Sequence, residues 1–267
     1  DPETATEAVV ARAAALGLEV SVWVWTTLPE SGDTARHAQL WEDRGVRYFT
    51  SNLPPAVLDW MGSTAGRRSL LIVGHRGASH SSSENTMQSV LLAFERGADG
   101  AEFDVQTSAD GKIFLLHDDT LRRTAGKEPC AGMPSGASEA DVLDTPVNEL
   151  SYEEVIRHVN VDFLGSGRET PPLLTEVMAK VPAGKFVFCE VKGGDLQTAE
   201  ALSELTLSEA WSSEQLIFIA FDLEVLKILR RRLPGFRALH IANVHRRVPE
   251  PLESQLLRVA ATAAGAS

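Results

Sequence analysis

Three short apolar stretches of the chain each end on side chains that can do chemistry. These side chains are His75 and Arg76 in the first stretch, Glu102 and Asp104 in the second, and Glu190 and Lys192 in the third. Residues two apart on a β-strand share one face, so the two side chains of the second stretch point the same way, as do those of the third. Carboxylates that gather in a desolvated site repel one another unless a cation or protons lie between them.

Oxygen-rich clusters of this kind suit Mg²⁺ or Ca²⁺, and no cysteine–histidine spacing in the chain indicates zinc. Two histidines, His75 and His117, lie beside the acidic stretches and could move protons. A divalent cation flanked by two histidines is the outline of a site for metal-assisted phosphoryl transfer.

The elements that must position these side chains alternate along most of the sequence. Strands are expected at 18–26, 46–50, 70–74, 101–106, 112–117, 186–191, 216–221 and 238–242, and the turn 109–111 predicts a hairpin between the fourth and fifth of them. Helices are expected at 7–16, 33–44, 55–61, 86–96, 151–159, 174–180, 198–205, 224–233 and 251–264. Ser151 and Glu154 predict a capping box at the start of the fifth helix. Such alternation of strands and helices predicts parallel β/α units. Because the charged side chains stand at strand ends, the pattern favours a TIM-type (β/α)₈ barrel. An open doubly wound sheet is less favoured, since no glycine-rich phosphate-binding motif follows a strand in this sequence.

Composition excludes several classes of protein. The chain has 267 residues and a net charge of −12, which argues against nucleic acid or an anionic membrane as the main partner. It contains no apolar run long enough for a transmembrane segment. Its two cysteines are expected to be free thiols, and the segment 119–146 is expected to be a polar surface excursion. No signal peptide is visible, and because the chain begins without methionine its location in the cell stays open.

Five blocks of the sequence resemble the glycerophosphodiester phosphodiesterase family when they are taken together and in order. The blocks are His75-Arg76-Gly77, Glu84-Asn85-Thr86, Glu102-Phe103-Asp104, His117-Asp118 and Glu190-Val191-Lys192. One departure is Ser83, which stands where the family usually has proline. The resemblance implies a barrel that hydrolyses glycerophosphodiesters to glycerol 3-phosphate and an alcohol.

The resemblance also implies a role for each site residue. It assigns metal binding to Glu102, Asp104 and Glu190, acid–base catalysis to His75 and His117, and contact with the substrate phosphate to Arg76 and Lys192. Glu84 would be a further ligand or an organiser of the site, and Trp25 would border the substrate pocket. The cofactor would be one divalent cation, Mg²⁺ or Ca²⁺. Which histidine is the acid stays open, as does whether water or a substrate hydroxyl attacks.

Two other activities remain alternatives at this stage. Related barrels act as phospholipases D on lysolipids, but that requires an apolar surface, which the polar segment 119–146 does not offer. A repeat that has lost catalysis and only binds a phosphodiester or a partner is the non-enzymatic alternative.

The N-terminal part of the chain resembles the other end of the same barrel. Residues 17–26 resemble the penultimate strand, with Trp25 at its end, and residues 45–54 resemble the last strand, where Ser51 and Asn52 replace the usual acidic residue. By this analogy residues 1–62 supply strands seven and eight, 63–68 is a connector, and 69–267 supplies strands one to five. The sixth unit has no counterpart.

Such an order has two explanations, a piece of a tandem-repeat protein with a second barrel in the full chain, or a circular permutant. In either case one folded body requires the predicted strands at 18–26 and 46–50 to lie beside the strand at 70–74. A gap is then expected between the strand at 238–242 and the strand at 18–26.

Overall fold

The structure is a computed structural model that describes residues 7–16, 18, 20–24, 45–52, 71–125, 139–159, 169–192, 196–242, 254–255 and 257. Its strands are β1 (Ser21–Val24), β2 (Tyr48–Ser51), β3 (Leu71–Gly74), β4 (Gly100–Thr107), β5 (Ile113–Leu115), β6 (Phe186–Val191), β7 (Leu216–Ala220) and β8 (Arg237–His240). Its helices are α1 (Glu7–Ala15), α4 (Met87–Glu95), α5 (Glu139–Asp144), the 3₁₀ turn η1 (Val147–Glu149), α6 (Tyr152–His158), α7 (Leu174–Met178), α8 (Leu196–Ser208) and α9 (Leu223–Arg232).

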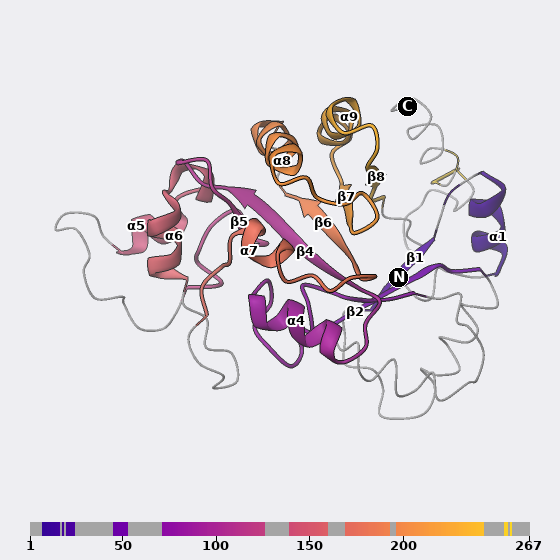
Figure 1. Ribbon diagram of the computed structural model, residues 1–267, viewed down its shortest axis with the longest axis horizontal. Coiled ribbons are helices and arrows are strands. Elements are labelled where there is room, and N and C mark those ends of the chain that lie inside the picture. The colour runs from indigo at the N-terminus through magenta and orange to yellow at the C-terminus, as the bar shows by residue number, and fades with distance from the viewer. Residues whose placement is uncertain are drawn as a thin grey trace.

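All the strands belong to one sheet with the order β1-β2-β3-β4-β6-β7-β8, and β5 is attached to β4. Neighbours along this order are parallel, whereas β4 and β5 form the antiparallel hairpin that the sequence predicts. The sheet is curled, and α8 and α9 lie on its outer side (Figure 1). The fold is therefore an incomplete (β/α) barrel, as expected.

The N-terminal strands lie where the end of a barrel would meet its beginning. Trp23 of β1 pairs with Thr50 of β2, and Thr50 pairs in turn with Val73 of β3. The prediction that the strands near 18–26 and 46–50 lie beside the strand near 70–74 is confirmed. At the other end of the order stands β8, and within the described ranges no strand joins it to β1.

Alternation along the strands divides the core into two layers. One face of the sheet carries Phe103, Cys189 and Phe218, which pack against the apolar sides of the helices. The opposite face carries Val73 and Phe188 together with other side chains that fill the inside of the curl. This periodicity of two also decides which polar side chains of β4 and β6 point inward.

The turn after β3 is held against the start of α4. Thr86 caps α4 by accepting a hydrogen bond from the backbone N–H of Ser89 at 3.1 Å. Gly77 has a φ of +83°, and a Cβ atom there would lie 2.4 Å from the backbone carbon of Ser89. Only glycine permits this approach, which brings the residues after β3 beside the helix.

Part of the segment 119–146 is fixed to the core. The described part of that segment contains α5, and Leu121 is fully buried in a cluster with Phe114 of β5 and Leu150. A few apolar side chains therefore anchor a segment whose average composition is polar. The capping box predicted at the start of α6 is confirmed, since Ser151 and Glu154 bond each other's backbone N–H groups.

Several sequence predictions lie outside the described residues. They are the helices at 33–44 and 55–61, the connector 63–68, most of the helix at 251–264, and Trp25. Among the helices that are described, none combines the length and apolar character needed to cross a bilayer. Cys189 is a free, buried thiol whose pKa is raised well above its usual value by burial.

If the N-terminal strands are part of one cooperative body, Phe49→Ala in β2 should destabilise the whole protein. Phe49 is fully buried, and truncation of a buried phenylalanine costs about 3–5 kcal/mol. Denaturant unfolding followed by tryptophan fluorescence measures this loss. Phe221→Ala is the matched control, because Phe221 is 50% exposed and its loss should change the free energy of unfolding little. An unchanged unfolding midpoint in Phe49→Ala would show that β2 is not part of that body.

Candidate active site

Three carboxylates meet inside the curl of the sheet. Glu102 and Asp104 are two apart on β4, and Asp104 pairs in register with Glu190 of the neighbouring β6. All three are buried, and one carboxylate oxygen of each lies within 4.8 Å of the others. The structure thus brings together the three acidic residues that the sequence predicts as metal ligands.

Glu102 has the least favourable electrostatic environment of the three. Burial raises its pKa well above the usual value, and repulsion from Asp104 and Glu190 adds to the effect. One of its oxygens, Oε2, accepts a hydrogen bond from the backbone N–H of Arg76 at 2.9 Å. The other, Oε1, is buried and has no hydrogen-bond partner among the residues that the structure describes. A buried oxygen with a free lone pair beside two more carboxylates fits a hard divalent cation.

Basic side chains balance the other two carboxylates. Lys192 places Nζ 2.6 Å from Glu190 Oε1 and 3.0 Å from Asp104 Oδ1. Burial acts to lower the pKa of Lys192, but the two carboxylates outweigh it and raise that pKa. Arg76 lies 3.4 Å from Asp104 Oδ2 through Nε, and its Nη1 donates to Glu84 at 2.9 Å. Both predicted phosphate-binding residues therefore stand at the acidic cluster.

Asn85 is a site residue to which the sequence assigned no role. Its Nδ2 donates to Asp104 Oδ2 at 2.8 Å, and its Oδ1 accepts from the backbone N–H of Asp104 at 3.1 Å. Asn85 and Arg76 both have positive φ values, +55° and +52°, which non-glycine residues rarely adopt. The position of Asn85 inside the motif Glu84-Asn85-Thr86 was the signal that could have identified it.

His75 lies at the edge of the acidic cluster and is buried. Its Nε2 is 4.0 Å from Glu102 Oε2, and its Nδ1 is 2.5 Å from Oδ1 of Asn52. Trp23 packs edge-on against the imidazole, with 5.1 Å between ring centroids. Burial lowers the pKa of His75 to about 3, and the charge of Arg76 adds to this effect. His75 is therefore neutral at ordinary pH.

His117 is held by a carboxylate. Its Nδ1 is 2.6 Å from Asp118 Oδ1, and the imidazole is about one third exposed. Burial acts to raise the pKa of Asp118, but hydrogen bonds from Arg123 and His117 outweigh it and lower that pKa to about 2. Asp118 is thus a permanent anion beside His117.

Arg123 joins the two sides of the site. It donates to both oxygens of Glu84, at 3.0 and 2.6 Å, and also pairs with Asp118. Glu84 contacts Arg76 in turn, so a chain of ion pairs runs from the acidic cluster to His117. Glu84 thus lies at the centre of this network, between Arg76 and Arg123. The sequence did not identify Arg123, because its partners are distant in the chain.

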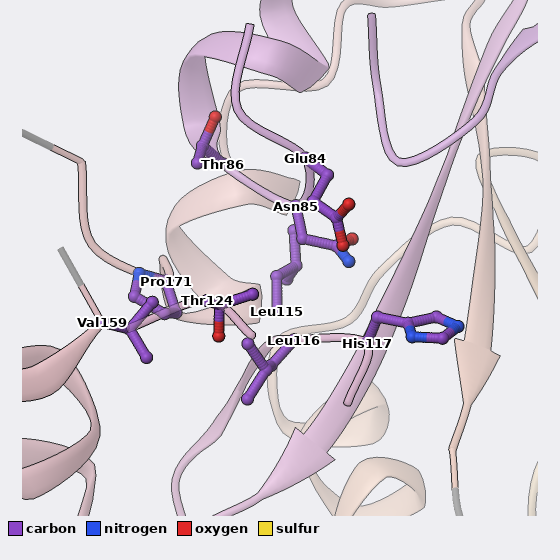
Figure 2. Close-up of a pocket in the computed structure, with 9 residues that line it drawn as sticks. All are labelled: Glu84, Asn85, Thr86, Leu115, Leu116, His117, Thr124, Val159 and Pro171. Atoms are coloured by element: carbon purple, nitrogen blue, oxygen red, sulfur yellow. The ribbon is translucent and has the colours of Figure 1, made fainter. Parts of the chain in front are cut away.

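A small hollow lies beside His117, which is one of its lining residues. Its lining includes Glu84, Thr86, Leu116 and Pro171, and none of the three clustered carboxylates. Figure 2 shows the imidazole of His117 directed away from Pro171, toward the strands. The hollow therefore lies next to His117 and Glu84, and it is not the cavity of the acidic cluster.

Comparison with known proteins gives one consistent family. The chain matches the glycerophosphoryl diester phosphodiesterase family over residues 75–267. It is 45% identical over 170 residues to a glycerophosphodiester phosphodiesterase of Caldanaerobacter subterraneus, covering 62% of this chain and 64% of that protein. It is 40% identical over 161 residues to human glycerophosphodiester phosphodiesterase 1, covering 60% of this chain and 45% of that protein. The chain thus spans less than two thirds of the length of these curated relatives.

The fold is similar to solved structures of the same family. The crystal structure of a glycerophosphodiester phosphodiesterase from Thermotoga maritima aligns with a TM-score of 0.51 at 27% identity, covering 72% of this chain and 70% of that one. A family member from Silicibacter pomeroyi aligns with a TM-score of 0.53 at 19% identity, covering 68% and 69%, which bears on the fold alone. The strand order, the acidic cluster and these matches agree, and the chain belongs to the glycerophosphoryl diester phosphodiesterase family.

Proposed function

We propose that this chain hydrolyses glycerophosphodiesters to glycerol 3-phosphate and an alcohol, with one divalent cation, Mg²⁺ or Ca²⁺. The observation that carries the proposal is the buried cluster of Glu102, Asp104 and Glu190 flanked by His75, in a chain of this family. A phosphodiester carries one negative charge, and a site of this kind offers cationic groups and two imidazoles to it.

The three clustered carboxylates would hold the cation through oxygen atoms alone. A cation bound there supplies positive charge against the negative charge that develops on the phosphate oxygens. The chain's own residues do the rest of the work. Arg76 offers a planar fork of donors that suits phosphate oxygens, and Lys192 adds a second positive charge at the same place.

His75 and His117 form the acid–base pair in this proposal. One imidazole takes the proton of the attacking hydroxyl or water, and the other gives a proton to the leaving alcohol oxygen. Neutral His75 can accept a proton, and the contact of His117 Nδ1 with Asp118 orients the second imidazole. Attack by water and attack by a substrate hydroxyl both need these two proton transfers.

We propose in addition that the chain carries the last two units of the barrel before the first five. The supporting observation is that β1 and β2 precede β3 in the sheet, where strands seven and eight would close on strand one. Residues 1–62 and 69–267 are then pieces of barrel joined by 63–68. Sequencing the complete reading frame distinguishes the origins, because a tandem-repeat protein must encode further barrel units and a circular permutant encodes one set.

The activity is tested with glycerophosphocholine in the presence of Mg²⁺ or Ca²⁺, with coupled detection of glycerol 3-phosphate. The variant His75→Ala/His117→Ala should lose activity by at least about 100-fold, since a general acid or base contributes roughly 10²–10⁴-fold. Full activity in that double variant would contradict the proposed roles. A strong preference for lysophosphatidylcholine would instead identify a phospholipase D, and binding of substrate without turnover would identify a binding repeat.

Glu102→Gln tests the cation site through stability. Above pH 4.5, the ordinary pKa of a glutamate, the folded state with its raised pKa holds a proton that the unfolded state has released. The metal-free protein should therefore lose stability as pH rises through this window. A cation at 100 times its Kd should restore about 2.7 kcal/mol in the wild type at pH 8.

Glu102→Gln should show little of that restoration, and its metal-free stability should depend less on pH. Thermal unfolding with chelator and with added Mg²⁺ or Ca²⁺ measures both effects. Glu153→Gln is the matched control, because the Glu153 side chain is 78% exposed and lies outside the cluster. Equal stabilisation of Glu102→Gln and the wild type by the cation would place the cation elsewhere.

Arg123→Ala tests the ion-pair chain between the two sides of the site. Its loss leaves Glu84 and Asp118 without their shared partner, so activity should fall by at least about tenfold, which corresponds to about 1.4 kcal/mol of barrier. Arg122→Ala is the control, since the neighbouring Arg122 pairs only with exposed Asp144 among the contacts seen here. Equal activity of the two variants would show that the chain of ion pairs is dispensable.

A further inference from the structure

Asn52 stands at the point where the N-terminal strands reach the active site. It follows β2 directly, and Ser51 before it pairs in register with Gly74 at the end of β3. The backbone N–H of His75 donates to the Ser51 carbonyl at 2.8 Å, and that of His80 donates to the Asn52 carbonyl at 3.0 Å. Two hydrogen bonds thus fix the backbone around Asn52 against the loop that carries His75.

The side chain of Asn52 determines which nitrogen of His75 carries hydrogen. Its Oδ1 lies 2.5 Å from Nδ1 of the imidazole, and an amide oxygen can only accept a hydrogen bond. Nδ1 must therefore be the donor. In a neutral imidazole the other nitrogen, Nε2, then presents a lone pair, and Nε2 is the atom that lies 4.0 Å from Glu102.

The ring of His75 is fixed from a second direction by Trp23, which packs edge-on against it from β1. His117 offers a contrast within the same site, because its Nδ1 contacts the carboxylate of Asp118 rather than an amide. A carboxylate stabilises a charged imidazolium, whereas a neutral amide fixes orientation without adding a charge. The chain thus holds its two histidines by chemically different partners.

We propose that Asn52 is a positioning residue that fixes the Nδ1–H tautomer of His75, so that the unprotonated Nε2 faces the acidic cluster. The inference deepens the proposed function and rests on it for the role of His75 in proton transfer. It also gives the N-terminal segment a direct part in the site, since both residues that orient His75 come from before residue 53.

The tautomer is measured on the full chain by nitrogen NMR with ¹⁵N-labelled histidine. The His75 signals are identified by their absence in His75→Gln. In the wild type at neutral pH, Nδ1 should have the shift of a protonated ring nitrogen and Nε2 that of an unprotonated one. A protonated Nε2 in the wild type would overturn the proposal, whether or not the chain proves to be a phosphodiesterase.

Two substitutions separate positioning from packing. Asn52→Leu keeps the approximate shape without the acceptor, so the two tautomers should become mixed and kcat should fall by about tenfold or more, part of the roughly 10²–10⁴-fold that acid–base groups contribute. Its KM should change little. Asn52→Asp keeps an acceptor at the same place and should retain the Nδ1–H tautomer and more of kcat than the leucine variant. Asn148→Leu, at an exposed position of η1, should resemble the wild type.

Unchanged kcat and an unchanged tautomer in Asn52→Leu would refute the positioning role. Equal loss in the leucine and aspartate variants would also refute it, because that result indicates packing alone. If Asn52→Leu does not fold, the wild-type and Asn52→Asp spectra still decide the tautomer. Absence of phosphodiesterase activity in the wild type would refute the proposed function and leave the spectra as the test of the Asn52 contact.

Discussion

Repulsion among three buried carboxylates is the constraint on which the rest of this site depends. The periodicity of β4 and the register of β6 force Glu102, Asp104 and Glu190 onto one inner face, away from water. Polar neighbours contact these carboxylates, and both the ammonium of Lys192 and the amide of Asn85 lie against Asp104. Even so, no described residue supplies a hydrogen-bond partner to Glu102 Oε1. Folding therefore builds a local deficit of positive charge, which a bound cation would remove.

One curled sheet places two imidazoles in different surroundings. His75 is buried between an amide and an indole, and burial keeps it neutral. His117 is more exposed and lies against an anion that Arg123 holds in place. The two imidazoles therefore differ in burial and in the chemistry of their partners. The site uses the N-terminal strands as well as β4 and β6, because Trp23 of β1 and Asn52 after β2 both contact His75.

Local patterns predicted most of what lies along single strands. The two-residue spacing in Glu102-Phe103-Asp104 gave the shared face, and the capping box at Ser151 gave the start of α6. Contacts between distant segments were not predictable from spacing. An example is the contact of Trp23 with the ring of His75, which joins β1 to the turn after β3. In the same way, the polar composition of the segment 119–146 gave no sign that Leu121 is buried against Phe114.

The left-handed backbone of Arg76 and Asn85 has a consequence for which residues suit these two positions. Glycine adopts such a conformation without steric strain, so at both positions the backbone conformation favours glycine, which has no side chain to bind a carboxylate. Arg76 pairs with Asp104, and Asn85 bonds the same carboxylate. Backbone strain and side-chain bonding thus favour different residues at these two positions. Glycine at either position would relieve the strain and leave the buried Asp104 carboxylate with one partner fewer.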